Sequence, residues 1–246
     1  MIFKNLKILS AALLLAACAS KPAPPDWQAN AFAALKGFSA AYLSGNTRLA
    51  DAELARARLE IASTGRADLL ARAELTRCAV RVASLEFDDC AAYQPLATEA
   101  APAEQAYAAF LSGRWTGLDP ALLPAQHRAL VLNAAVNKPA NTAPDSPAGK
   151  KKENLASPSE GRSVLDAIED PLARLVAAGV LLQSSRLTPA DIMVATETAS
   201  SQGWRRPLLA WLGVQFKRAN DAGDLAAAGR IQRRIDLVLQ LVQKIQ

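Results

Sequence analysis

The stretch Asp170–Leu182 reads DPLARLVAAGVLL, and it combines the two features that decide the fold of this chain. It opens on an aspartate followed by proline, the pair that caps a helix and fills its first turn. The residues after this pair are strongly apolar, and we expect them to form a buried helix. The apolar side chains are Leu172, Leu175, Val176, Val180, Leu181 and Leu182.

Similar helix starts recur on both sides of this stretch. Thr188-Pro189-Ala190-Asp191 is the clearest of them, with a hydroxyl cap, a proline at the first position and a carboxylate in the first turn. Asp119-Pro120 predicts a helix that reaches about Val136, and Asp26 is expected to cap the first helix of the mature protein.

The composition supports an all-α protein. Alanine and leucine dominate the 246 residues, aromatic residues make up 5%, and β-branched runs are nearly absent. Such a composition favours helices that pack closely through small side chains. Short turns between the first helices make them antiparallel neighbours, so the predicted fold is an array of helical hairpins.

The last predicted helix carries apolar residues three and four positions apart. We expect this seam to pack within the fold, where it would cover Trp211 and Phe216; a dimer contact is the alternative. The seam residues are Ala228, Ile231, Ile235, Val238, Val242 and Ile245.

Changes in composition divide the chain into segments. Residues 137–162 hold four prolines, three consecutive lysines and almost nothing apolar, which is typical of a disordered linker. The predicted organisation is a leader, a proline-rich tether, a helical domain, this linker and a C-terminal helical segment. Their ranges are 1–17, 18–26, 27–136, 137–162 and 163–246.

The leader contains a motif with a specific chemistry. Lys4 and Lys7 precede an apolar run that ends in Leu15-Ala16-Ala17-Cys18. The run has the length of a signal-peptide core and is too short to span a bilayer. The motif resembles the lipobox of bacterial lipoproteins. This resemblance implies cleavage before Cys18, a diacylglycerol on its thiol and an acyl chain such as palmitate on the new amine.

The resemblance also implies a location. Ala19 and Ser20 follow the cysteine, and neither is the aspartate that retains such lipoproteins in the inner membrane. The expectation is therefore a lipid anchor in the bacterial outer membrane, with the protein facing the periplasm. An ordinary secretory signal is the alternative; a transmembrane anchor fits poorly because Lys21 and three prolines follow almost at once.

The two remaining cysteines are Cys78 and Cys90. An even number of cysteines in an oxidising compartment favours a disulfide, which would join the end of one helix to the following loop. Two buried thiols that act as small apolar groups are the alternative.

Positive charge gathers in the C-terminal segment. A basic surface there would suit anionic lipid or an acidic partner, whereas helix faces that long basic side chains merely solvate are the alternative. Nucleic acid is disfavoured, because no binding motif or aromatic interleaving is present. The candidate surface residues are Arg205, Arg206, Lys217, Arg218, Arg230, Arg233 and Arg234.

A short sequence occurs twice. Ala40-Ala41-Tyr42-Leu43-Ser44-Gly45 returns as Ala108-Ala109-Phe110-Leu111-Ser112-Gly113, at twice the period of about 34 residues that tetratricopeptide repeats use. The Ala-rich helix pairs with a glycine at the turn resemble that family. The resemblance implies a repeat-like array of hairpins.

Signatures of catalysis and cofactor binding are missing from the sequence. His127 is the single histidine, and no Gly-x-Ser-x-Gly turn, glycine-rich phosphate loop or metal-ligand spacing accompanies it. We therefore predict no catalytic residue, metal or small-molecule cofactor. A hydrolase that uses two distant carboxylates stays open, with Glu99, Glu104 and Asp119 as candidates by location.

These observations favour a non-enzymatic adaptor or assembly factor that binds another envelope protein. Helical hairpin arrays offer extended grooves for peptides or helices, and membrane anchoring raises the local concentration. A peptidoglycan hydrolase with paired carboxylates and a basic module that binds anionic lipid are the two alternatives.

Overall fold

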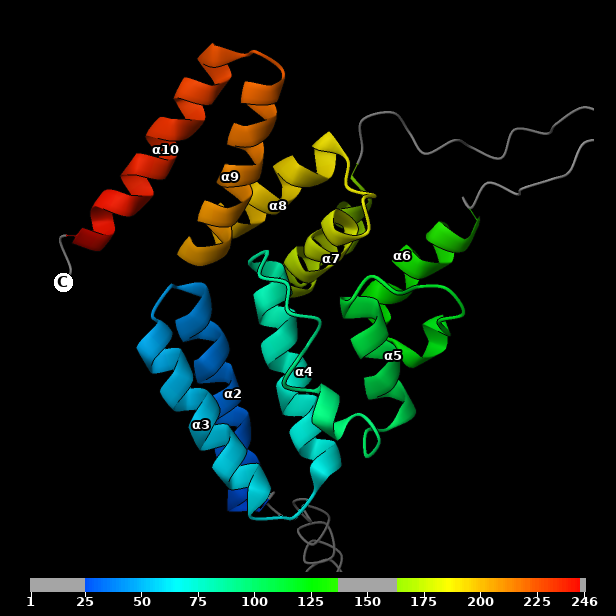
Figure 1. The fold of residues 1–246 in the computed structure, drawn as a ribbon. Helices are drawn as coiled ribbons and strands as arrows, with labels where there is room; N and C mark the ends of the chain where they lie inside the picture. Colours follow the sequence, from blue (N-terminus) through cyan, green and yellow to red (C-terminus); the bar gives the residue numbers. More distant parts are fainter. Residues whose placement is uncertain (1–24, 137–162, 244–246) are drawn as a thin grey trace, which may run out of the picture.

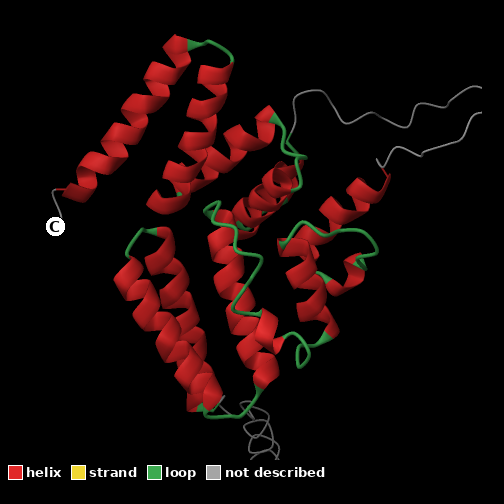
Figure 2. Cartoon of the chain, viewed as in Figure 1, coloured by secondary structure: helices red, strands yellow, loops and turns green. Residues whose placement is uncertain are grey.

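The computed structural model describes residues 25–136 and 163–243, which form helices joined by turns and loops, with no strand among them (Figures 1 and 2). Three short 3-10 turns accompany the α-helices: η2 (Gln94–Leu96), η3 (Pro120–Leu122) and η4 (Val164–Ala167). The helices are α2 (Asp26–Leu43), α3 (Thr47–Ala62), α4 (Ala67–Ala83), α5 (Pro102–Leu111), α6 (Ala125–Val136), α7 (Pro171–Gln183), α8 (Pro189–Ser201), α9 (Arg205–Asp221) and α10 (Leu225–Gln243).

Consecutive helices pair as hairpins, as the short turns predicted. Helices α2 and α3 form one hairpin and α9 and α10 another, at opposite ends of the view in Figure 1. Between them, α4 packs against α7, and α7 continues into α8 and α9. The predicted all-α class and the pairing of neighbouring helices are therefore confirmed.

The two helical segments share one core, a point that the sequence left open. The largest cluster of buried apolar side chains draws Phe110 and Leu111 from the first segment and Leu175, Val176 and Trp211 from the second. The Trp211 indole N–H donates to the Ala83 carbonyl at 3.3 Å, which ties α9 to the end of α4. The predicted linker 137–162 lies outside the described residues.

Local capping chemistry explains where several helices begin. Asp170 accepts a hydrogen bond from the Ala173 amide at 2.7 Å, and Thr188 and Asp191 form a reciprocal capping box at the start of α8. Asn46 caps α3 in the same way, accepting from the Leu49 amide at 3.1 Å. Side chains two or three residues away therefore satisfy amides that the helix leaves without partners.

Two predicted caps differ from the structure. Asp26 lies inside α2 as its first residue and makes no capping hydrogen bond, because the helix starts directly after Pro25. Asp119 does cap, but the element it opens is the turn η3, and α6 begins only at Ala125. Pro124, just before α6, interrupts the helix that was expected to run unbroken to Val136.

The repeated hexapeptide forms the same helix ending twice. Gly45 and Gly113 both adopt left-handed backbone, with φ of 87° and 69°. The following amides, of Asn46 and Arg114, donate back to the carbonyls of Ala41 and Ala109 at 2.8 and 2.9 Å. The chain then diverges, because α3 starts at once after the first copy whereas a loop and η3 follow the second.

Candidate functional site

A groove lies between α8, α9 and α10. It has a volume of about 680 Å³ and a mainly apolar lining. Helix α10 packs mainly on α9 and stands at the outer edge of the described structure (Figure 1). The groove is open to solvent. Its lining residues are Pro189, Ile192, Met193, Val194, Thr196, Glu197, Gln215, Arg218, Ile231 and Arg234.

Helix α8 forms a rigid wall of this groove. Its first turn is held by the capping box, and the buried Asp191 also accepts a hydrogen bond from the Ser163 hydroxyl at 2.7 Å. One turn further along, the Gln215 side-chain amide of α9 donates to the Thr196 hydroxyl at 2.9 Å. The groove is therefore built on fixed helices, and Met193 stands 67% exposed on its wall.

Helix α10 supplies the opposite wall. Ile231 is half-buried against α9, and Arg234 lies three residues later on the groove side. Arg230 and Leu237 share the face of Arg234, because they lie four residues before and three residues after it. Leu237 is 61% exposed, which leaves an apolar side chain beside the arginines with no cover from the described residues.

The electrostatic balance at the groove is positive. The acids of the C-terminal hairpin are already engaged: Asp221 pairs with Lys217 at 2.8 Å, and Asp224 accepts from the Ala227 amide at 2.8 Å. Asp236 accepts from the Gln232 side chain at 2.8 Å. The arginines at and beside the groove make no ion pair with any described carboxylate; they are Arg218, Arg230, Arg233 and Arg234.

The structure divides the predicted basic surface. Arg218 and Arg234 line the groove, and Arg230 and Arg233 lie beside it on α10. Lys217 is neutralised by Asp221 on its own helix. Arg205 and Arg206 belong elsewhere, since both lie at the start of α9 against the α2–α3 turn. The seven residues therefore form no single surface.

Arg206 joins α9 to the α2–α3 hairpin. Its guanidinium donates to the Tyr42 carbonyl at 2.9 Å and to the Thr47 hydroxyl at 2.7 Å, and it pairs with Glu86 at 3.2 Å. It also lies 4.1 Å from the centre of the Tyr42 ring. Burial, followed by the neighbouring Glu86, raises the pKa of Tyr42, so the phenol under this cation stays neutral.

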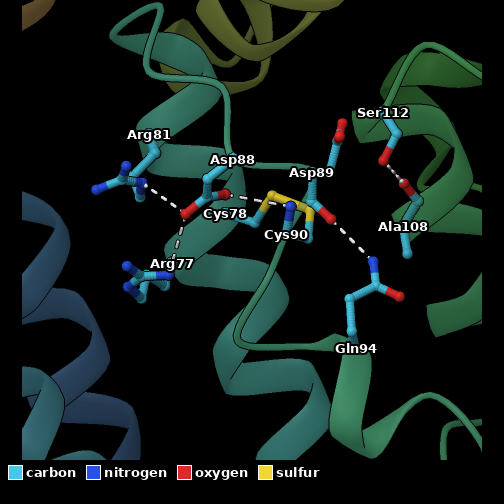
Figure 3. The surroundings of a disulfide bond; sticks show 9 residues. All are labelled: Arg77, Cys78, Arg81, Asp88, Asp89, Cys90, Gln94, Ala108 and Ser112. Carbon is cyan, nitrogen blue, oxygen red and sulfur yellow. Dashed lines mark hydrogen bonds and ion pairs between the residues drawn. A yellow bond between two sulfur atoms is a disulfide. The ribbon is translucent and has the colours of Figure 1, made fainter.

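Cys78 and Cys90 are joined by a disulfide between α4 and the loop that follows it (Figure 3). Asp88 reinforces the loop, since it lies 3.2 Å from Arg81 and 3.5 Å from Arg77 and accepts from the Cys90 amide at 3.1 Å. The acidic side chains of Glu86 and Asp88 in this loop both pair with arginines. The sequence signal for this pairing was the spacing of Arg77 and Arg81, which lie four residues apart on α4.

The remaining predicted site residue, Cys18, lies outside the described residues. The lipidation that the lipobox implies therefore stays a prediction.

The three carboxylates considered for hydrolysis lie on different elements. Glu104 is buried at the start of α5 and pairs with Arg72 at 2.6 Å. Asp119 caps η3 with its carboxylate. Glu99 is exposed in the loop between η2 and α5. No cluster of metal-ligating side chains occurs among the described residues.

His127 is a buried imidazole in an aromatic cluster. It is 1% exposed, its ring centre lies 4.7 Å from that of Phe110, and Tyr107 lies 6.0 Å away. Its Nδ1 has no hydrogen-bond partner among the described residues. Burial lowers the pKa of His127 to about 4, against a smaller opposing effect of Asp170. The buried aromatic environment therefore favours the neutral form of the His127 imidazole.

We expect this histidine to make stability depend on pH. The unfolded chain takes up a proton near pH 6.5 and the folded chain only near pH 4, so stability is complete above pH 6.5 and falls as the pH drops. Between pH 7 and pH 5 the loss from this group is about 2 kcal/mol. Urea unfolding of the protein and of His127→Phe at both pH values would measure it.

The His127→Phe variant keeps the aromatic stacking but does not titrate, so its unfolding free energy should fall by about 2 kcal/mol less over the same range. All other titrating groups are common to the two proteins and cancel in the comparison. Parallel pH profiles would contradict the assignment.

Sequence reasoning did not find the groove. Met193 and Glu197 carry no motif, and Thr188-Pro189-Ala190-Asp191 was interpreted only as a helix start. No sequence signal could have found it, because the exposure of Met193 and the position of α8 next to α10 are set by the fold.

Comparison with known proteins gives no match to any family model, curated protein or solved structure. Within residues 25–136 and 163–243, none of the helices combines the length and the apolar character that crossing a membrane requires.

Proposed function

We propose that this protein is a lipid-anchored adaptor of the bacterial envelope, held in the outer membrane through Cys18 and facing the periplasm. The motif Leu15-Ala16-Ala17-Cys18 supports the anchor, and the residues after the cysteine support the outer membrane. More than one acyl chain gives durable attachment. Anchoring lets weak contacts with an envelope partner suffice, because it raises their effective concentration.

One observation carries the adaptor function: the open apolar groove between α8, α9 and α10. Its walls are helices fixed by capping and hydrogen bonds, so the surface is formed before a partner arrives. Exposed apolar side chains at a preformed groove mark interaction sites in soluble domains. Met193 is such a side chain here, and Leu237 is exposed on α10 one turn after the lining residue Arg234.

The fold suits this function in a second way. We infer that the hairpins form a repeat-like array, because the two copies of the hexapeptide end α2 and α5 with the same backbone turn. Stacked hairpins provide extended faces for protein binding. The groove would then be the binding face at the C-terminal end of the array.

Crosslinking in intact cells tests the adaptor function. A photo-crosslinking amino acid at position 193 should capture one envelope protein in stoichiometric amount, and the adduct should survive washing at high salt. The same amino acid at position 59 of α3 is the matched control, because Leu59 is 73% exposed and outside the groove. Recovery of only abundant, substoichiometric proteins at position 193 would contradict the proposal.

The anchor has its own test. Labelled palmitate should enter the protein in cells and fail to enter the Cys18→Ala variant. Label in that variant would contradict the lipobox assignment.

A further inference from the structure

We infer that the groove between α8, α9 and α10 binds an acidic amphipathic helix of a partner protein. This inference rests on the proposed adaptor function and specifies the chemistry of the partner. It follows from the shape of the groove, from the placement of its apolar side chains and from the arginines along its rim.

The shape of the groove suits a helix. Helices α8 and α10 form two walls above α9, whose Gln215 and Arg218 contribute to the lining. Helix α10 packs mainly on α9, so its groove side lacks the second neighbour that a helix in a bundle usually has. A fourth helix laid between α8 and α10 would complete a four-helix arrangement.

The apolar side chains of the lining follow helical spacing on α8, where Pro189 and Met193 are four residues apart. On α10 the apolar Ile231 lies three residues before Arg234. Met193 is 67% exposed and Leu237 is 61% exposed, although each lies on a helix whose other face is packed. A helix with apolar residues at i, i+3, i+4 and i+7 would cover such a surface.

The charge of the rim selects an acidic partner. Arg218 and Arg234 line the groove, and Arg230 lies one turn before Arg234. None of them is paired with a described carboxylate, whereas the acids of the hairpin are engaged. Glu197 is the single acidic residue of the lining. Carboxylates flanking the apolar face of a partner helix would therefore meet unpaired guanidinium groups.

The same charges disfavour two other occupants. A second copy that docked its own α10 here would bring arginines against arginines. A flat anionic membrane would need the basic side chains on one face, but Arg205 and Arg206 are packed against the α2–α3 turn and Lys217 is paired. An acidic helix needs only the arginines at the groove.

Two labelled peptides test the inference by fluorescence anisotropy. Both are helical 18-residue peptides with leucine at i, i+3, i+4 and i+7; one carries glutamate on the flanks of this face and the other carries lysine. The full-length lipoprotein is held in nanodiscs of neutral lipid. We expect saturable binding of the glutamate peptide and binding of the lysine peptide at least about tenfold weaker.

Charge reversal provides the decisive comparison. The double variant Arg218→Glu/Arg234→Glu should bind the glutamate peptide at least about tenfold more weakly than the native protein does. It should bind the lysine peptide more tightly. The control Arg48→Glu/Arg114→Glu makes the same change in net charge at exposed sites outside the groove and should leave both affinities within about threefold. Met193→Asp should lower the affinity for both peptides. Thermal unfolding would verify that each variant is folded.

Several results would overturn the inference. One is equal binding of the two peptides, and another is an equal loss of affinity in the control. Two further measurements test the other occupants. Sedimentation with vesicles of neutral and anionic lipid tests membrane binding, and sedimentation velocity tests self-association. If the groove variants abolish vesicle binding or self-association and leave peptide binding unchanged, the occupant is lipid or a second copy.

The two proposals fail in different ways. A stoichiometric partner captured at position 193, combined with no binding of either peptide, would overturn the acidic-helix inference and keep the adaptor function. Peptide binding in vitro without any stoichiometric partner in cells would overturn the adaptor function instead.

Discussion

Replacing Gly179 with alanine is expected to lower the free energy of unfolding by about 3 kcal/mol. Gly179 lies in α7 where this helix crosses α4. A Cβ atom at this position would lie 2.3 Å from the Val82 carbonyl oxygen and 2.9 Å from the Val82 Cγ1. The obstacle is backbone, which no change of rotamer can move, so the two helices would have to separate.

The crossing also joins the two segments of the chain. Helix α4 belongs to residues 25–136 and α7 to residues 163–243, and their contact lies within the shared core. Separation there would loosen Leu175 and Val176, both of which are fully buried. The loss should therefore exceed the gain of about 1 kcal/mol that alanine has over glycine in a helix.

Gly213→Ala is the matched control. Gly213 also lies inside a helix, α9, but a Cβ atom there would meet nothing within 4 Å. This variant should gain about 0.5–1 kcal/mol from helix propensity alone. Urea unfolding followed by circular dichroism measures both, and an equal effect of the two substitutions would contradict the close α4–α7 contact.

Removing the disulfide should lower the free energy of unfolding by about 3 kcal/mol, since it closes a short loop in the unfolded chain. The proposed variant is Cys78→Ala/Cys90→Ala, which leaves small apolar groups at two buried positions. The loop it releases contains Asp89 and Cys90 in left-handed backbone, with φ of 48° and 54°. Such backbone is costly for residues other than glycine and persists only where the surroundings hold it.

Reduction provides the control for this prediction. Dithiothreitol should shift the unfolding midpoint of the native protein toward that of the double variant, and it should leave the double variant unchanged. An unchanged midpoint of the native protein would indicate two buried thiols, the alternative that the sequence left open. The loop also positions Glu86 against Arg206, so its release should weaken the contact between α9 and the α2–α3 turn.

Much of the fold was predictable because its signals are local. The caps Asp170 and Thr188 act on amides three residues away, so their effect can be inferred from a few neighbouring residues. The same holds for the helix ending at Gly45 and Gly113. The error at Asp119 has a local cause too, because Pro124 ends the turn before the helix begins.

The candidate site was less predictable, because it depends on which residues the fold brings together. Arg206 and Arg218 look alike in the sequence as members of one basic segment. The structure places Arg206 against Tyr42, 164 residues away along the chain, and leaves Arg218 at an open groove. No periodicity or motif carries that information.

By itself, the sequence determined the helical class and several of the helix starts, since each depends on residues close together in the chain. The resemblance to a lipobox is equally local, and the anchor that it implies stays a prediction. Only the tertiary structure decided three features. The two segments share a core, α4 packs closely against α7 at Gly179, and α8 and α10 face each other across a groove. These outcomes depend on contacts between distant residues. Such contacts form where whole helix faces match in shape, and a local pattern cannot specify them.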